Sequence, residues 1–246
     1  MDHLAALGAF GIFVVRVARA AVGGQVEGRP VVTEAWRIGV LSLPVLLVIS
    51  LFVGTNLAIQ GYSAFRPLGG QRLVGLFVAL AGVRELAPIL AAAMVAAKAG
   101  TEMASQIAVM RTREQIDALE VMGVDPYAWL VVPRVLAILL VMPALTTIAI
   151  AVTVLSSLAV ATLQLGLDGA TFLDLVRQGV RPVDLGAGVL KAWVFGAIIA
   201  LVSCFCGFRS ERGPAGVGRA TNVAVVASSV AIVTINAVVS QVLYGG

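Results

Sequence analysis

Three charged side chains stand within long apolar stretches of this 246-residue sequence. Arg84 and Glu85 fall near the middle of one stretch, and Lys191 falls within another. A charge at the centre of a bilayer costs about 2.5 to 3.5 kcal/mol on insertion scales, so it normally faces a pocket, water or an opposite charge. Adjacent helical residues point in different directions, so we expect Glu85 to pair with Lys191 on another helix rather than with Arg84.

A polar segment, residues 101–127, contains a second group of residues of interest. Thr112 to Gln115 has the spacing of a capping box, which predicts a helix over 112–123. Gly123 suits the left-handed residue that ends a helix, and Asp125-Pro126 prevents continuation. One side of this helix is predicted to be apolar and the rest acidic: Ile116, Leu119 and Met122, with Glu114, Asp117 and Glu120. Such a helix could dock on a partner, or lie on its own protein or on the membrane face.

Several patterns that suggest chemistry are incomplete. The glycine-rich segment 213–218 lacks the Lys-Ser/Thr of a nucleotide-binding loop, so any ATP and Mg are expected to be bound by another subunit. Cys204 and Cys206, even with the distant His3, provide too few ligands for a tetrahedral metal site. We therefore expect neither an enzyme nor a resident cofactor.

The composition requires a membrane. Hydrophobic residues make up 60% of the chain and charged residues only 12%, about half the share in soluble proteins. The net charge of +4 is spread along the chain without a basic run, so nucleic acid is not the expected partner. A soluble fold would leave too much apolar surface in water.

The elements that position these residues are five predicted membrane spans. Each holds about 20 or more mostly apolar residues: 38–59, 73–97, 128–163, 185–207 and 223–243. Residues 1–37 are expected to form an N-terminal cytoplasmic segment with a helix in the interface, where Arg16 and Arg19 meet anionic lipid, or a helix packed on the protein. The fold class is therefore an all-α integral membrane protein. The charge order around residues 4–15 is the reverse of a signal peptide, so no cleavage is expected.

The basic residues predict the orientation. With a cytoplasmic N-terminus, eleven Lys and Arg residues fall in inside segments and four in outside ones. This is the positive-inside pattern, and five spans then place the C-terminus outside.

Several stretches of the chain together resemble one family. Residues 114–126 with 130–136, residues 83–88, and residues 213–221 with 224–226 are similar to the MlaE/YrbE permeases of MCE-type lipid ABC transporters. The resemblance implies five spans with an interfacial N-terminal helix in a bacterial inner membrane, or alternatively a plastid inner envelope. It implies that 112–123 is the coupling helix, which sits in a groove of a cytoplasmic ABC ATPase.

The same resemblance implies further partners. These are a second copy of the chain or a paralogous permease, an MCE-domain lipid-binding protein on the outer side, and phospholipid or another lipid as cargo. It also implies that Arg84, Glu85 and Lys191 border the lipid cavity, where Arg84 or Lys191 offers a cationic donor to a phosphate.

Two other classes of function compete with this one. A gradient-driven transporter could use Glu85 as its proton-linked group, although internally duplicated carriers show two corresponding halves and no such repeat is visible. A membrane scaffold would make the 112–123 helix merely adhesive.

Overall fold

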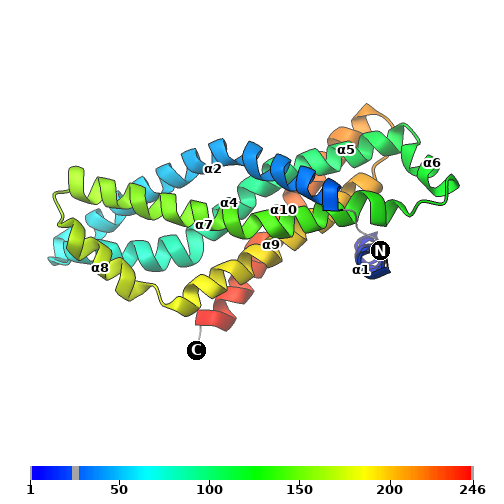
Figure 1. The fold of residues 1–246 in the computed structure, drawn as a ribbon. Helices are drawn as coiled ribbons and strands as arrows, with labels where there is room; N and C mark the ends of the chain where they lie inside the picture. Colours follow the sequence, from blue (N-terminus) through cyan, green and yellow to red (C-terminus); the bar gives the residue numbers. More distant parts are fainter. Residues whose placement is uncertain (1, 24–27, 245–246) are drawn as a thin grey trace. The chain divides into compact units, whose positions relative to one another are not determined.

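The computed structural model describes residues 2–23 and 28–244, and every regular element in those ranges is helical (Figure 1). The elements follow in the order α1 (Asp2–Gly23), α2 (Gly28–Phe65), two short 3-10 turns (Arg66–Leu68 and Gln71–Leu73), α3 (Val74–Phe77), a π-helical stretch (Val78–Leu86), α4 (Ala87–Val95), a second π-helical stretch (Ala96–Gly100), α5 (Thr101–Thr112), α6 (Gln115–Val121), a third π-helical stretch (Tyr127–Val131), α7 (Val132–Leu163), α8 (Gly169–Gly179), α9 (Pro182–Phe208) and α10 (Pro214–Tyr244).

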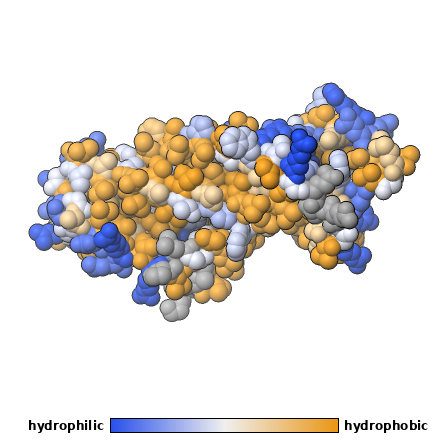
Figure 2. Space-filling view, in the orientation of Figure 1, coloured by the Kyte–Doolittle hydropathy of each residue, from blue (hydrophilic) through white to orange (hydrophobic). Residues whose placement is uncertain are grey.

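Five of the described helical segments are long and apolar enough to cross a bilayer. They are Gly28–Leu68, Gln71–Thr112, Tyr127–Leu163, Gly186–Phe208 and Pro214–Val242. Figure 2 shows hydrophobic side chains over the visible faces of α2 and α7, as expected of surfaces that meet lipid or another apolar partner. The all-α membrane class predicted from composition is confirmed.

Two of the helices extend well beyond the stretches expected to lie in the membrane. The helix that contains 38–59 begins at Gly28, and the helix that contains 73–97 continues to Thr112. Charged side chains in these extensions have partners on other helices. Arg37 pairs with Glu102, and the Arg134 Nε lies 3.8 Å from the Glu34 Oε1. These charged residues therefore do not end the helices, because each of them pairs with an opposite charge on another helix.

The chain divides into two compact units. Unit 1 comprises Met1–Leu41, Val95–Val141 and Phe195–Ala231, and unit 2 comprises Ser42–Met94, Met142–Val194 and Ile232–Gly246. The segments predicted to be cytoplasmic belong to unit 1, and the two predicted outside connections belong to unit 2.

The core of unit 1 joins α1 to the segment that was predicted to dock on a partner. Ten buried residues form this cluster: Phe13, Val17, Ala20, Ile107, Ile116, Leu130, Val131, Val132, Cys204 and Phe208. Aromatic rings strengthen it, since Tyr127 stacks on Phe208 with ring centroids 5.4 Å apart. α1 is therefore held by side-chain packing within this unit.

The core of unit 2 includes α8, a helix that lies between the predicted spans 128–163 and 185–207. The Asp168 carboxylate caps α8 by accepting from the Thr171 backbone N–H at 2.8 Å. Phe172 and Val176 then pack against α3 and its neighbours. The helices approach so closely that a Cβ on Gly75 would lie 2.5 Å from the Phe172 carbonyl oxygen. Only glycine fits there without a shift of the backbone.

Candidate functional site

The predicted pair of Glu85 and Lys191 forms, within unit 2. The Lys191 side chain is completely buried, and its Nζ lies 3.1 Å from the Glu85 Oε1. The ammonium also donates to the Ser240 Oγ at 2.8 Å and to the Arg84 backbone carbonyl at 3.1 Å. Glu85 and Lys191 come from the first π-helical stretch and α9, so the pair joins two elements as the sequence predicted.

The last helix completes this network. Asn236 on α10 donates to the Glu85 Oε2 at 2.9 Å, and the Ser240 hydroxyl lies 2.8 Å from the Glu85 Oε1. A buried ion pair is tolerated only when further hydrogen bonds satisfy its remaining donors and acceptors. The charge cluster, which we define as Glu85, Lys191, Asn236 and Ser240, meets that condition. The part played by Ser240 was not predicted from the sequence.

Arg84 points to different partners from those of its neighbour Glu85. Its Nη2 lies 2.8 Å from the Asp184 Oδ2 and 2.9 Å from the Gly179 carbonyl oxygen. Asp184 is nearly buried and also accepts from the Arg181 backbone N–H at 2.7 Å. Asp184 was not predicted as a functional residue, although a carboxylate in the first turn of a membrane helix is a signal that the sequence displays. In this conformation the charge of Arg84 is balanced by a carboxylate.

The helix predicted over 112–123 is shorter, and its predicted capping box is wrong. α6 begins at Gln115 after Glu114, which has a left-handed backbone with φ of 58°, and ends at Val121. Thr112 is instead the last residue of α5, where its hydroxyl donates to the Ala108 carbonyl at 2.9 Å. The hydroxyl therefore stabilises the end of one helix rather than the start of the next.

The predicted role of Gly123 in ending α6 is confirmed, although the helix itself already ends at Val121. Gly123 has φ of +74°, and the following residue, Val124, donates its backbone N–H to the Leu119 carbonyl at 2.9 Å. This is the arrangement in which a left-handed glycine satisfies the last carbonyls of a helix. The chain can therefore turn sharply toward Asp125 and Pro126.

The two sides of α6 differ from the predicted pattern at one residue. Ile116 is buried and Leu119 packs on the unit 1 core, as predicted. Met122, which was expected on the same apolar side, is 68% exposed, and its neighbour Val121 is 89% exposed. Met122 lies beyond the last helical residue, so the helical period no longer applies to it. Val121 and Met122 form a solvent-facing apolar tip, the α6 tip.

The acidic side of α6 is joined to the α9–α10 connection. Arg212 reaches both the Glu114 Oε1 and the Asp117 Oδ2 at 2.9 Å. All three side chains are mostly exposed, so each pair contributes little stability by itself. The fork of one guanidinium across two carboxylates nevertheless fixes the direction of the connection relative to α6.

Comparisons with known proteins agree on one family. The model of the family described as Permease MlaE matches residues 31–242. A probable ABC transporter permease protein of Rickettsia conorii is 35% identical over 97% of this chain and 92% of its own length. The chloroplastic protein Trigalactosyldiacylglycerol 1 of Arabidopsis thaliana is 35% identical over 91% of this chain and 64% of its own. The intermembrane phospholipid transport system permease protein MlaE of Haemophilus influenzae is 28% identical over 85% and 80%.

Proposed function

Because the chain belongs to the MlaE permease family, we propose that it is the membrane subunit of an ATP-driven phospholipid transporter. It is a multi-pass protein, and the related Haemophilus protein is named for phospholipid transport. In this proposal the chain provides the path for the lipid, while a separate cytoplasmic ABC ATPase binds ATP and Mg and supplies the energy. We expect no catalytic residue in the chain itself.

The observation that supports coupling to an ATPase is the construction of α6. Ile116 fixes one side of this short helix to the unit 1 core, while the α6 tip, Val121 and Met122, faces solvent. We infer that this exposed apolar pair makes a contact with another protein. Both ends of α6 are also held: Arg212 pairs with Asp117 near its start, and the turn at Gly123 closes its end. A force applied to the tip is therefore transmitted to the helices rather than lost in a loose loop.

The lipid path is assigned to the region of the charge cluster. Glu85 is only partly covered, with 34% of its side chain exposed, whereas Lys191 is fully covered. We infer that Glu85 is the group that a polar headgroup meets, with Lys191 as its counter-charge, while the neighbouring Arg84 is paired with Asp184. The remaining partners are a second copy of the chain or a paralogue, and an MCE-domain lipid-binding protein on the outer side.

The proposed location is a bacterial inner membrane with the N-terminus in the cytoplasm and the C-terminus outside. The excess of basic residues in the segments of unit 1 supports this orientation. It also places α6 on the side where ATP is available. A cysteine introduced at Val121 should react with a membrane-impermeant maleimide only after the cells are opened.

The proposal is tested at the α6 tip. Affinity-tagged Val121→Asp and Met122→Asp variants would be isolated from their native membrane in mild detergent, and co-purified Walker-motif ATPase would be quantified by mass spectrometry. A charge at the centre of a contact should lower ATPase recovery at least about tenfold. Leu68→Asp is the matched control, because Leu68 is an exposed apolar residue of a connection in unit 2. Unchanged recovery with both tip variants would contradict the docking role.

A further inference from the structure

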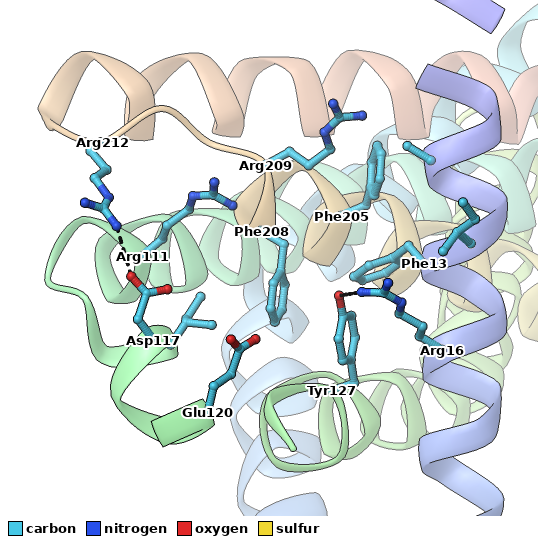
Figure 3. A pocket seen from close by; sticks show the side chains of 13 residues that line it. Phe13, Arg16, Arg111, Asp117, Glu120, Tyr127, Phe205, Phe208, Arg209 and Arg212 are labelled. Carbon is cyan, nitrogen blue, oxygen red and sulfur yellow. Dashed lines mark hydrogen bonds and ion pairs between the residues drawn. The ribbon is translucent and has the colours of Figure 1, made fainter. Parts of the chain in front are cut away.

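A cavity of about 370 Å³ opens within unit 1, beside α6 (Figure 3). Its walls come from α1, α5, α6, the third π-helical stretch and the end of α9. The volume is at the lower end of the range of about 300 to 1,000 Å³ for small-molecule sites. It suits a headgroup or a similarly small polar group rather than a complete phospholipid.

One wall of the cavity is aromatic and rigid. Phe13, Tyr127 and Phe208 pack on one another, with the Phe13 and Tyr127 centroids 5.7 Å apart and the Tyr127 and Phe208 centroids 5.4 Å apart. Figure 3 shows these rings side by side in the middle of the cavity wall. Such a wall offers an apolar surface on which the glycerol end of a lipid could rest.

The remaining wall is cationic. Four arginines line the cavity against two carboxylates, so it carries an excess of two positive charges; the residues are Arg16, Arg111, Arg209 and Arg212, with Asp117 and Glu120. Three of the arginines are already engaged: Arg16 donates to the Tyr127 hydroxyl at 3.2 Å, Arg212 pairs with α6, and Arg209 lies over the Phe205 ring.

Arg111 differs from the other three. Among the described residues its guanidinium has no hydrogen bond and no ion pair, and Figure 3 shows it reaching toward the space between α5 and Phe208. A guanidinium presents a planar fork of donors that matches a phosphate. Arg111 is therefore available for an anion, with Arg16 near the opposite end of the aromatic wall.

The surroundings of the cavity indicate the source of that anion. α1 turns large apolar side chains outward: Leu7 is 67% exposed, and Ile12, which also lines the cavity, is 59% exposed. In a protein that lies in a bilayer, an exposed apolar helix with arginines beside it belongs at the level of the lipid headgroups. We propose that this cavity binds the phosphate of an anionic lipid headgroup, so that a membrane lipid is seated directly against α6.

The residues that line this cavity belong to unit 1, whereas the charge cluster belongs to unit 2. Lipid binding to the cavity is measured without ATP or any partner protein, so its failure and the failure of the proposed transport function are distinguishable. The test uses the full-length protein in dodecyl maltoside, titrated calorimetrically with dihexanoyl phosphatidylglycerol. Dihexanoyl phosphatidylcholine and inorganic phosphate serve as parallel titrants. Arg111→Gln removes the available cation, and Arg113→Gln is the matched control, because Arg113 is an exposed arginine two residues away that does not line the cavity.

Wild type and Arg113→Gln should bind phosphatidylglycerol with the same affinity, and Arg111→Gln about tenfold more weakly, since a charged hydrogen bond of this kind contributes at least that much. Phosphatidylcholine should bind more weakly than phosphatidylglycerol. Equal affinity of Arg111→Gln and wild type would overturn the proposal. Inorganic phosphate binding as tightly as phosphatidylglycerol would overturn the assignment to a lipid.

Discussion

Lys191 is completely buried, yet it lies 3.1 Å from Glu85, whose side chain is 34% exposed. Groups outside the protein can therefore reach Glu85 but not Lys191. Lys191 can change partners only if helices move, whereas Glu85 can meet a new group without such a movement. This asymmetry is the reason for treating Glu85 as the contact residue and Lys191 as its counter-charge.

Removal of Glu85 should destabilise the protein. Glu85→Ala leaves the Lys191 ammonium buried without its opposite charge, which costs about 3 kcal/mol or more. The double variant Glu85→Ala/Lys191→Met should recover most of that loss, because it removes both charges. Thermal unfolding in detergent measures both effects, and Glu211→Ala, in an exposed pair with Arg219, is the control with almost no expected change.

Transport should also depend on this carboxylate. A correctly assembled Glu85→Ala complex should transfer fluorescent phospholipid from proteoliposomes more slowly than wild type. The double variant separates stability from function, since it should regain stability without regaining transport. Transport at the wild-type rate by a correctly assembled Glu85→Ala complex would contradict a role for Glu85 in the lipid path.

The close approach of α3 and α8 predicts opposite effects at two glycines. Gly75→Ala brings a Cβ to 2.5 Å from the Phe172 carbonyl oxygen and should destabilise the protein by about 1 to 3 kcal/mol. Gly186→Ala is the matched change on α9, where the added Cβ meets no atom within 4 Å, so it should be neutral or slightly stabilising. A lower melting temperature for Gly186→Ala than for Gly75→Ala would contradict this packing.

Loss of the Arg212 fork should affect coupling more than stability. Arg212→Gln frees the α9–α10 connection from Glu114 and Asp117, but the exposed pairs contribute less than about 1 kcal/mol each. We expect a nearly unchanged melting temperature and a lower rate of transport per ATP hydrolysed in the reconstituted complex. Arg219→Gln, which breaks only the Arg219–Glu211 pair, should leave that ratio unchanged. Equal ratios for both variants would contradict a role for the fork.

The cap of α8 predicts a dependence on pH. Hydrogen bonds from the Thr171 backbone N–H and hydroxyl lower the pKa of Asp168; desolvation opposes them, and the Arg72 charge adds the least. A lowered pKa in the folded state means that the cap stabilises at neutral pH and loses its effect as pH falls below the ordinary carboxyl value of about 3.9.

Asp168→Ala should therefore melt below wild type at pH 7, and the difference should shrink as the pH approaches 3. Melting curves recorded between pH 3 and pH 7 measure this. Asp174→Ala, on the exposed side of the same helix, should show no such convergence. If the difference in melting temperature between Asp168→Ala and wild type grew as the pH fell, the predicted direction of the pH dependence would be wrong.

Contacts could be predicted from the sequence where an unpaired charge in the membrane would cost too much free energy. A carboxylate and an ammonium in apolar stretches must be neutralised, so the Glu85–Lys191 pair could be predicted from the two residues alone. The hydrogen bonds of Ser240 and the choice of Arg84 as the partner of Asp184 could not, because only the arrangement of α9 and α10 against the π-helical stretch decides which polar groups come within reach.

Sequence patterns at helix ends were less reliable guides than the cost of an unpaired charge. The capping-box pattern at Thr112 was outweighed by continuation of α5, which placed Glu114 rather than Thr112 before α6. Gly123 was a better guide, because a left-handed residue is difficult for other amino acids. The cavity against α6 depends on α1, which is distant in sequence, and no pattern in either segment predicted it.

The proposed function depends on a contact between α6 and the ATPase of a lipid transporter. Native mass spectrometry of the tagged protein, isolated with its partners from its own membrane in mild detergent, tests it most directly. We expect an assembly with two permease chains, two ATPase chains and bound phospholipid, together with an MCE-domain protein. A stable assembly that lacks any ATPase, under conditions that preserve a known ABC complex, would contradict it and favour a gradient-driven transporter or a scaffold.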